Sequence, residues 1–243
     1  MSGRLVGRHT LVGLIALVCW AIFWFTRLEW DPEMRFWRAV GDASLLLLII
    51  ALVLGPLAKL RPALGKLLPW RREFGIWFGV LALAHTLLIL NGWVRWDVPR
   101  FFGYEFVPEL GRTARMEPGF GLANLIGLVA VAWALLLTAT SSDWAIDRLG
   151  PSAWKWLQYG AYGIFYLVAL HTFYFLFQHY TLSFHRNVPP PNWFRWPFLV
   201  LALLVPLLQT AAFWKTVRRR RAAPEPVAVA APRGRRASSE RGA

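Results

Sequence analysis

Cysteine is nearly absent from this chain, and charged residues are few. Cys19 is the only cysteine among 243 residues, and Asp, Glu, Lys and Arg together make up 16% of them. A lone cysteine excludes an internal disulfide and any cysteine-rich metal cluster. Cys19 stands in an apolar segment, where its expected role is that of a small buried filler.

A glycine-rich dinucleotide fingerprint is also missing, because no such motif follows a strand pattern anywhere in the sequence. The polar stretches are too short for a flavin or nicotinamide domain. If these residues take part in redox chemistry, their electrons therefore come from a separate donor.

Long apolar runs are what the sequence has in abundance. Hydrophobic residues make up 57% of the chain, including 15 Trp and 17 Phe, and a membrane-crossing helix needs roughly 20 such residues. The expected spans are 10–25, 41–58, 74–93, 119–140, 156–177 and 196–214. They predict an all-α fold, a polytopic integral membrane bundle of six helices. Arg4 and Arg8 precede the first run as in a signal peptide, but no Ala-x-Ala-like cleavage site follows, which favours a retained helix.

The net charge of +14 is distributed unevenly between the segments that join these spans. If the N-terminus is cytoplasmic, the inside segments hold 18 of the 27 Lys and Arg, and the outside segments hold 9 together with 8 of the 13 acids. This positive-inside asymmetry predicts that both termini are cytoplasmic. We expect the membrane to be a bacterial-type inner membrane. It argues against a nucleic-acid partner. The run Arg218–Arg221 is expected to end the last helix and to contact anionic lipid headgroups.

We divide the chain into four parts. They are an N-terminal transmembrane helix and external loop (1–40), a core of helices two to five (41–177), an external loop with the last transmembrane helix (178–217), and a basic, disordered cytoplasmic tail (218–243). The longest external loop, 94–118, has the length to fold over a site as a cap or docking surface. A solvated connector is an equally good interpretation of it.

Two histidines stand inside apolar segments, His85 in the third expected span and His171 in the fifth. A polar ring at membrane depth is costly without a partner, so each is a functional-site candidate. His85 lies about 12 residues into its helix and His171 about 15 residues into its own, and both helices are expected to run outward. With a rise of ~1.5 Å per residue, both rings reach a similar depth, in the middle to external half of the membrane. The pair could supply both axial ligands of one b-type heme, which leaves no open iron position and favours electron transfer.

The residues alone leave other interpretations of this pair open. The histidines could form a proton relay in a transporter or channel, or could merely pack in a non-enzymatic scaffold. Of the other histidines, His9 is expected to be a solvated flank residue. His179 and His185 are expected to be interfacial residues on the external side. Alternatively, one of them contacts a heme propionate, a quinone headgroup or an external partner.

Several motifs occur in an order and spacing that resemble the ferric reductase-like transmembrane domain family. They are Gly41 with the apolar run to Gly55-Pro56, then Arg71-Arg72 with Gly75 and His85, then Trp156, Gln158 and Tyr162 ahead of His171. The resemblance spans about 41–177. It extends to one branch of the family, the heme-binding membrane subunits of periplasmic methionine sulfoxide reductase systems.

The resemblance implies a membrane electron carrier in which His85 and His171 ligate the iron of a heme b. It also implies a quinol or a separate flavin reductase as the electron donor, so a quinone or flavin is a further cofactor to consider. The acceptor would be external, either ferric iron or a periplasmic reductase subunit. Arg95 or Arg100 is then expected to pair with the heme propionates.

Two positions depart from the family pattern. Members of the methionine sulfoxide reductase branch, like the NADPH oxidases, carry a further histidine 13 residues before the fifth-helix ligand. The two-heme oxidases also carry a histidine 14 residues before the third-helix ligand. Here these positions hold Gln158 and Arg71. Because a carboxamide is a poor heme ligand, we predict one heme.

Overall fold

The computed structural model describes residues 3–117, 119–179 and 190–222. Within these ranges, six helical stretches are long and apolar enough to cross a membrane, which confirms the six expected spans. Their bounds are Leu5–Phe25, Pro32–Leu60, Pro62–Val94, Phe120–Ala139, Pro151–Gln178 and Arg195–Ala222. The tail expected to be disordered lies, from residue 223 on, outside the described residues.

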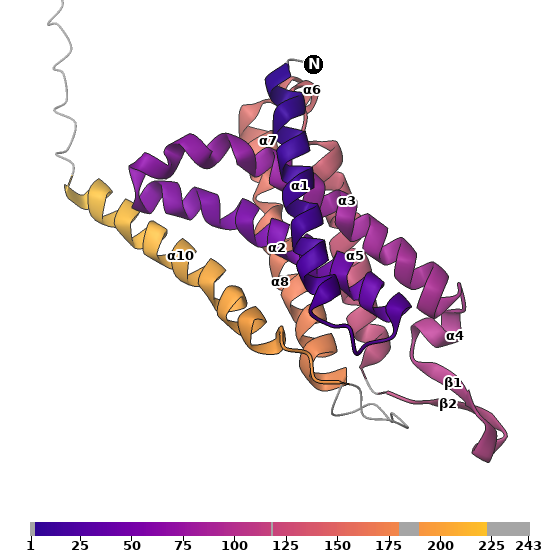
Figure 1. Ribbon diagram of the computed structural model, residues 1–243. Coiled ribbons are helices and arrows are strands. Elements are labelled where there is room, and N and C mark those ends of the chain that lie inside the picture. Colours follow the sequence, from indigo (N-terminus) through magenta and orange to yellow (C-terminus); the bar gives the residue numbers. More distant parts are fainter. Residues whose placement is uncertain (1–2, 118, 180–189, 223–243) are drawn as a thin grey trace, which may run out of the picture.

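Figure 1 shows the order and arrangement of the elements of the bundle. The helices that build the spans are α1 (Gly3–Phe25), α2 (Pro32–Leu60), α3 (Arg71–Ile89), α5 (Phe120–Ala139), α7 (Pro151–Gln158), α8 (Gly160–Phe173) and α10 (Arg195–Ala222). A 3₁₀ segment, η1 (Pro62–Trp70), precedes α3, and the π-helical turns η2 (Leu90–Val94) and η4 (Tyr174–Gln178) extend α3 and α8. The connecting elements are α4 (Val98–Phe101), η3 (Pro108–Leu110) and α6 (Asp143–Leu149).

The expectation of a purely helical chain needs one correction, because the loop 94–118 contains a β-hairpin. Its strands β1 (Tyr104–Val107) and β2 (Arg112–Arg115) pair antiparallel, with Tyr104 opposite Arg115 and Val107 opposite Arg112. The hairpin extends beyond the ends of the helices (Figure 1). Most of its residues are exposed, so it lacks the alternation of apolar and polar positions by which a half-buried strand is recognised.

Local sequence signals explain where the connecting helices begin. Asp31 caps α2 by accepting hydrogen bonds from the backbone N–H groups of Glu33 and Met34, at 3.0 and 3.1 Å, and Pro32 occupies the first helical position. Ser142 caps α6 in the same manner, from the N–H of Ala145 at 3.1 Å. These caps lengthen the helices beyond the apolar runs, so that α2 begins nine residues before the expected span at Gly41.

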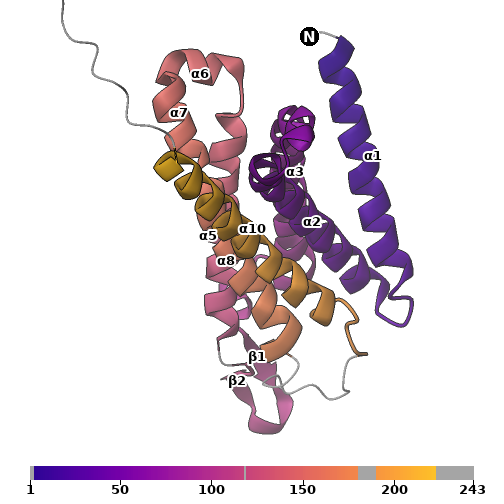
Figure 2. The ribbon, with the colours of Figure 1, turned by 90° about the vertical axis from the view of Figure 1, so that its left-hand side faces the viewer.

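Helix α2 is the central helix of the bundle. It packs against α1, α3 and α10, while α5 packs on α8 to form a second pair (Figure 2). Ser44 of α2 donates a buried hydrogen bond to the carbonyl of Phe78 in α3, at 3.1 Å. The bundle therefore contains two helix pairs, α2–α3 and α5–α8, and each histidine of interest lies on the second helix of a pair.

A buried ion pair fixes the connection between α1 and α2. Arg27 Nη2 lies 2.6 Å from Asp42 Oδ2, and the Arg27 side chain is 1% exposed. The Arg27 guanidinium also lies over the rings of Phe23 and Trp30. Because breaking one partner of such a pair leaves a buried charge uncompensated, the contact holds the turn firmly against α2.

The start of α1, α6 and the end of α10 gather toward one end of the bundle, and the hairpin lies at the other (Figure 1). Because the number of spans is even, the start of α1 and the end of α10 lie at the same end of the bundle. We retain the prediction that the end with α6 is cytoplasmic and that the hairpin end is external, on the basis of the charge asymmetry.

Candidate functional site

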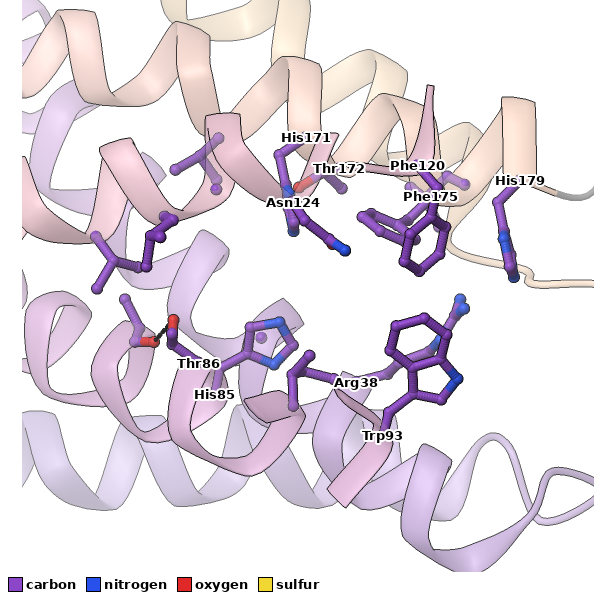
Figure 3. A pocket seen from close by; sticks show the side chains of 18 of the residues that line it. Arg38, His85, Thr86, Trp93, Phe120, Asn124, His171, Thr172, Phe175 and His179 are labelled. Atoms are coloured by element: carbon purple, nitrogen blue, oxygen red, sulfur yellow. Dashed lines mark hydrogen bonds between the residues drawn. The ribbon is translucent and has the colours of Figure 1, made fainter. Parts of the chain in front are cut away.

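A cavity of about 490 Å³ opens between the α2–α3 pair and the α5–α8 pair. Ligand sites in proteins measure roughly 300–1,000 Å³ and are lined mainly by apolar groups with a few polar ones. The apolar lining includes Leu45, Phe78, Trp93, Phe120, Val131, Phe175 and Leu176, and the polar lining includes Arg38, Asp42, His85, Glu117, Asn124, His171 and His179. His85 and His171 extend from opposite walls of this cavity (Figure 3).

His85 is held on α3 by the backbone of α2. Its Nδ1 lies 2.8 Å from the carbonyl oxygen of Trp37. Because a carbonyl only accepts hydrogen bonds, Nδ1 must donate, and in the neutral ring Nε2 keeps its lone pair. This tautomer, with the second nitrogen anchored by a backbone acceptor, is the one found in metal-binding histidines.

His171 is held on α8 by the backbone of α5 in the same way. Its Nδ1 donates to the carbonyl oxygen of Ala123 over 2.8 Å. In both cases the acceptor lies 48 residues before the histidine. The two backbone carbonyls therefore hold two neutral imidazoles in fixed orientations, each on the wall of the cavity.

A glycine one helical turn after each acceptor makes room for the ring. A Cβ built on Gly41 would lie 2.9 Å from Cε1 and Nδ1 of His85, and a Cβ on Gly127 would lie 2.7 Å from Nδ1 of His171. Real Cβ atoms essentially never come this close to a neighbour. The two glycines are thus required by the position of the imidazoles.

The two halves of the site repeat each other along the chain. A constant spacing of 86 positions relates the two halves: Trp37 corresponds to Ala123, Gly41 to Gly127 and His85 to His171. A threonine follows each histidine, Thr86 and Thr172, and both line the cavity. Each histidine-bearing helix also passes into a π-helical turn a few residues further on, η2 after His85 and η4 after His171, a feature common near functional sites. The cavity thus has two equivalent walls.

The same anchoring pattern recurs nearer the other end of the bundle, but without histidines. Arg71 Nε donates to the carbonyl of Ala51 at 3.1 Å, and Gln158 Nε2 donates to that of Leu137 at 3.3 Å. These carbonyls lie 14 residues after those of Trp37 and Ala123, respectively, on the same two helices. Neither Arg71 nor Gln158 lines the cavity.

Arg38 lines the cavity, although no sequence pattern indicated it. Arg38 follows Trp37 on α2 and reaches the wall between the histidines and the mouth of the cavity at the hairpin end, which is the end expected to be external. Its guanidinium lies over the Trp30 ring. Arg95 is exposed, and Arg100 lies over the ring of Trp93, outside the lining of this cavity. Arg38 carries no signal in the hydropathy pattern, because it precedes the apolar run of α2.

The mouth of the cavity at the hairpin end carries a hydrogen-bonded cluster around Glu117. Tyr174 donates to Glu117 Oε1 at 2.6 Å, and His179 Nδ1 lies 2.8 Å from Oε2. The sequence pointed to His179 through its place at the end of the fifth span, but nothing marked Glu117 as its partner. His185, the other external candidate, lies outside the described residues.

Known proteins similar to this chain indicate its family. Residues 39–169 match the family described as ferric reductase like transmembrane component. Similar relatives are the protein-methionine-sulfoxide reductase heme-binding subunits MsrQ of Bordetella pertussis, Bordetella parapertussis and Bordetella bronchiseptica. Each is 29% identical over 180 residues, which cover 70% of this chain and 78% of the relative. No solved structure matches the chain. Because the family match extends over more than half of its residues, the chain belongs to the ferric reductase-like transmembrane components.

Proposed function

We propose that this protein binds one heme b between His85 and His171 and transfers electrons through it to an acceptor on the external side of the membrane. The observation that carries the proposal is the pair of matching imidazoles, each anchored through Nδ1 to a backbone carbonyl and each on the wall of one cavity. The names of the MsrQ relatives, which describe heme-binding subunits, support it.

The residues present fit this cofactor. Gly41 and Gly127 leave the space that the two rings occupy, and apolar and aromatic side chains line most of the cavity. When bound, a bis-histidine heme exchanges single electrons and offers no open position for a substrate. The chain's own contribution is to fix both rings, to exclude water and to place Arg38 near the external mouth.

One heme is the expected content. Arg71 and Gln158 already use their side-chain nitrogens to bond the carbonyls of Ala51 and Leu137, and neither group is a suitable iron ligand. With no second heme toward the cytoplasm, a quinol oxidised within the membrane is the donor we favour, and a separate flavin reductase is the alternative. The acceptor that we propose is a periplasmic reductase subunit, with ferric iron as the alternative.

A test uses vesicles in which the hairpin end of the protein faces outward. The heme is reduced chemically, and membrane-impermeant ferricyanide is then added to the outside. We expect reoxidation of the whole heme population within the mixing time, because the site lies in the external half. If reoxidation requires permeabilised vesicles, the electron path proposed here is wrong.

Arg38 is expected to tune the heme. Replacing it with glutamine removes a cation beside the cavity, and a cation stabilises the reduced, less positive state more than the oxidised one. The midpoint potential of Arg38→Gln should therefore fall, as measured by a redox titration of the heme absorbance. Arg100→Gln is the matched control, since Arg100 lies outside the cavity lining. A larger change in Arg100→Gln than in Arg38→Gln would favour Arg100, the residue expected from the sequence, as the group that acts on the heme.

A further inference from the structure

The connection between the third and fourth spans supplies part of the cavity wall. Five of its residues line the cavity, namely Phe101, Gly103, Glu105, Met116 and Glu117. The backbone N–H of Met116 donates to the carbonyl oxygen of Gly103 at 2.9 Å, which joins the two chain segments at the base of the hairpin. We call these two segments, residues 101–103 and 116–117, the cap. The cap covers the mouth of the cavity, whereas most of the hairpin beyond it is exposed.

Asn124 of α5 attaches the cap to the wall that carries His171. Its Nδ2 donates to the carbonyl oxygen of Phe101 at 2.8 Å, and the residue is 8% exposed. Asn124 lines the cavity and directly follows Ala123, whose carbonyl accepts from His171. Figure 3 shows Asn124 beside His171 on the same wall. One turn of α5 therefore holds both the imidazole and the cap.

The backbone of the cap packs directly on α5. Gly121 lies three residues before Asn124, on the same face of the helix. A Cβ built on Gly121 would lie 2.5 Å from Cδ1 and 3.0 Å from Cα of Phe102. Gly103, with a φ of 82°, comes as close to Phe120, since its Cβ would lie 3.2 Å from that of Phe120. These distances leave no space for a layer of water between the cap and α5.

The repeat of 86 positions relates Asn124 to Arg38. Each residue follows the carbonyl that anchors a histidine, and each reaches the chain ahead of its own helix. Arg38 lies over the ring of Trp30, which precedes α2, and Asn124 bonds Phe101, which precedes α5. The two walls thus use the same position to contact a connecting segment, with a cation on α2 and a neutral amide on α5.

We propose that Asn124 is a positioning residue, which holds the cap over the heme and thereby keeps the midpoint potential of the heme above its value in contact with water. This inference rests on the proposed function. The oxidised iron carries one more positive charge than the reduced iron, and water stabilises the more highly charged state. A site that excludes water therefore favours the reduced heme and raises its midpoint potential.

The first test is a redox titration of the heme absorbance in purified Asn124→Leu holoprotein. Leucine has a similar size but cannot donate a hydrogen bond to Phe101, so the midpoint potential should fall below that of the wild type. The low-spin spectrum should persist, because His171 keeps its own carbonyl partner. Asn91→Leu is the matched control, since Asn91 is exposed and lies outside the cavity lining. A wild-type midpoint potential in Asn124→Leu would overturn the inference.

A second measurement follows the cap itself and does not depend on the absorbance of the heme. Hydrogen exchange, read by mass spectrometry, reports how often the N–H of Met116 leaves the carbonyl of Gly103. In Asn124→Leu this exchange should be faster by roughly tenfold or more, as expected for the loss of one buried hydrogen bond. Exchange at the wild-type rate would show that Asn124 does not hold the cap.

Gly121→Ala opens the cap by a different route and leaves Asn124 in place. The added methyl group would meet Phe102, so the cap has to move away from α5, whereas alanine itself favours the helix. We expect a lower midpoint potential and faster exchange of the cap, as in Asn124→Leu. This variant carries the test if Asn124→Leu does not fold. Loss of the low-spin spectrum in Asn124→Leu would instead indicate that Asn124 acts through His171, and would overturn the role proposed for the cap.

The outcomes also separate this inference from the proposed function. Wild-type protein that contains no heme contradicts the proposed function and, with it, any effect of Asn124 on a midpoint potential. Wild-type protein that contains heme, with an unchanged midpoint potential in both Asn124→Leu and Gly121→Ala, contradicts only the role of the cap.

Discussion

Replacing either His85 or His171 with alanine is expected to remove all bound heme from the purified protein. Both imidazoles line the same cavity, and each is fixed by a backbone carbonyl at 2.8 Å, so the loss of either one leaves a single anchored imidazole of this pair for the iron. A heme with one axial ligand would also lose the low-spin state that two imidazoles impose. The measurement is the heme content per chain of each variant, from the pyridine hemochrome spectrum.

His9→Ala is the matched control for this pair. His9 belongs to α1, away from the cavity lining, so its replacement should leave the heme content unchanged. Retention of half the wild-type heme in His85→Ala or His171→Ala would indicate a second heme, which the positions of Arg71 and Gln158 argue against. Full retention of a low-spin b-type spectrum in both variants would show that other residues ligate the iron.

Gly41→Ala and Gly127→Ala are expected to weaken heme binding by roughly tenfold or more, as changes in the groups that orient metal ligands do. The new methyl group would lie 2.9 Å from the ring of His85 or 2.7 Å from that of His171, so each ring would have to leave its carbonyl partner. Heme retention during dilution, or transfer to an apoprotein acceptor, measures the change.

The predicted loss of heme affinity is informative because the same substitutions should make the helices more stable. Alanine favours a helix over glycine by about 1 kcal/mol, so the substitutions by themselves should stabilise α2 and α5. A loss of heme would therefore come from the contact with the imidazole and not from a weakened helix. Gly75→Ala is the control, because no atom lies within 4 Å of the position that its Cβ would take. Wild-type heme affinity in both Gly41→Ala and Gly127→Ala would contradict the proposed ring positions.

The membrane spans could be predicted because a transmembrane helix has to be apolar along its whole length. Their ends could not be predicted as well, since the caps extend the helices into polar sequence. Helix α2 continues outward past Gly41 to Pro32 and thereby carries Arg38 and the Trp37 carbonyl. A hydropathy pattern does not register these residues.

The histidines could be found because a polar ring is unusual in an apolar segment, and their similar depth followed from counting residues. The groups that orient them could not be found in this way. The carbonyls of Trp37 and Ala123 carry no signal in the side-chain sequence, and a glycine such as Gly41 is common in membrane helices. Only the repeat of 86 positions, visible once both halves are aligned, connects them.

The mouth of the cavity at the hairpin end was the least predictable part of the site. Arg95 and Arg100 are the arginines expected from the sequence to pair with the propionates, whereas Arg38 is the arginine that lines the cavity, from α2. Glu117 stands in a loop rich in charges, so its burial next to His179 depends on how that loop folds. Such contacts between distant segments are set by tertiary packing and not by local pattern.

The most direct measurement is a reduced-minus-oxidised visible spectrum of the detergent-purified protein, with the heme per chain determined by pyridine hemochrome. The account predicts a sharp α-band at the position of a low-spin b-type heme and one heme per chain. Protein that remains colourless after expression with ample heme would contradict the assignment of His85 and His171 as heme ligands.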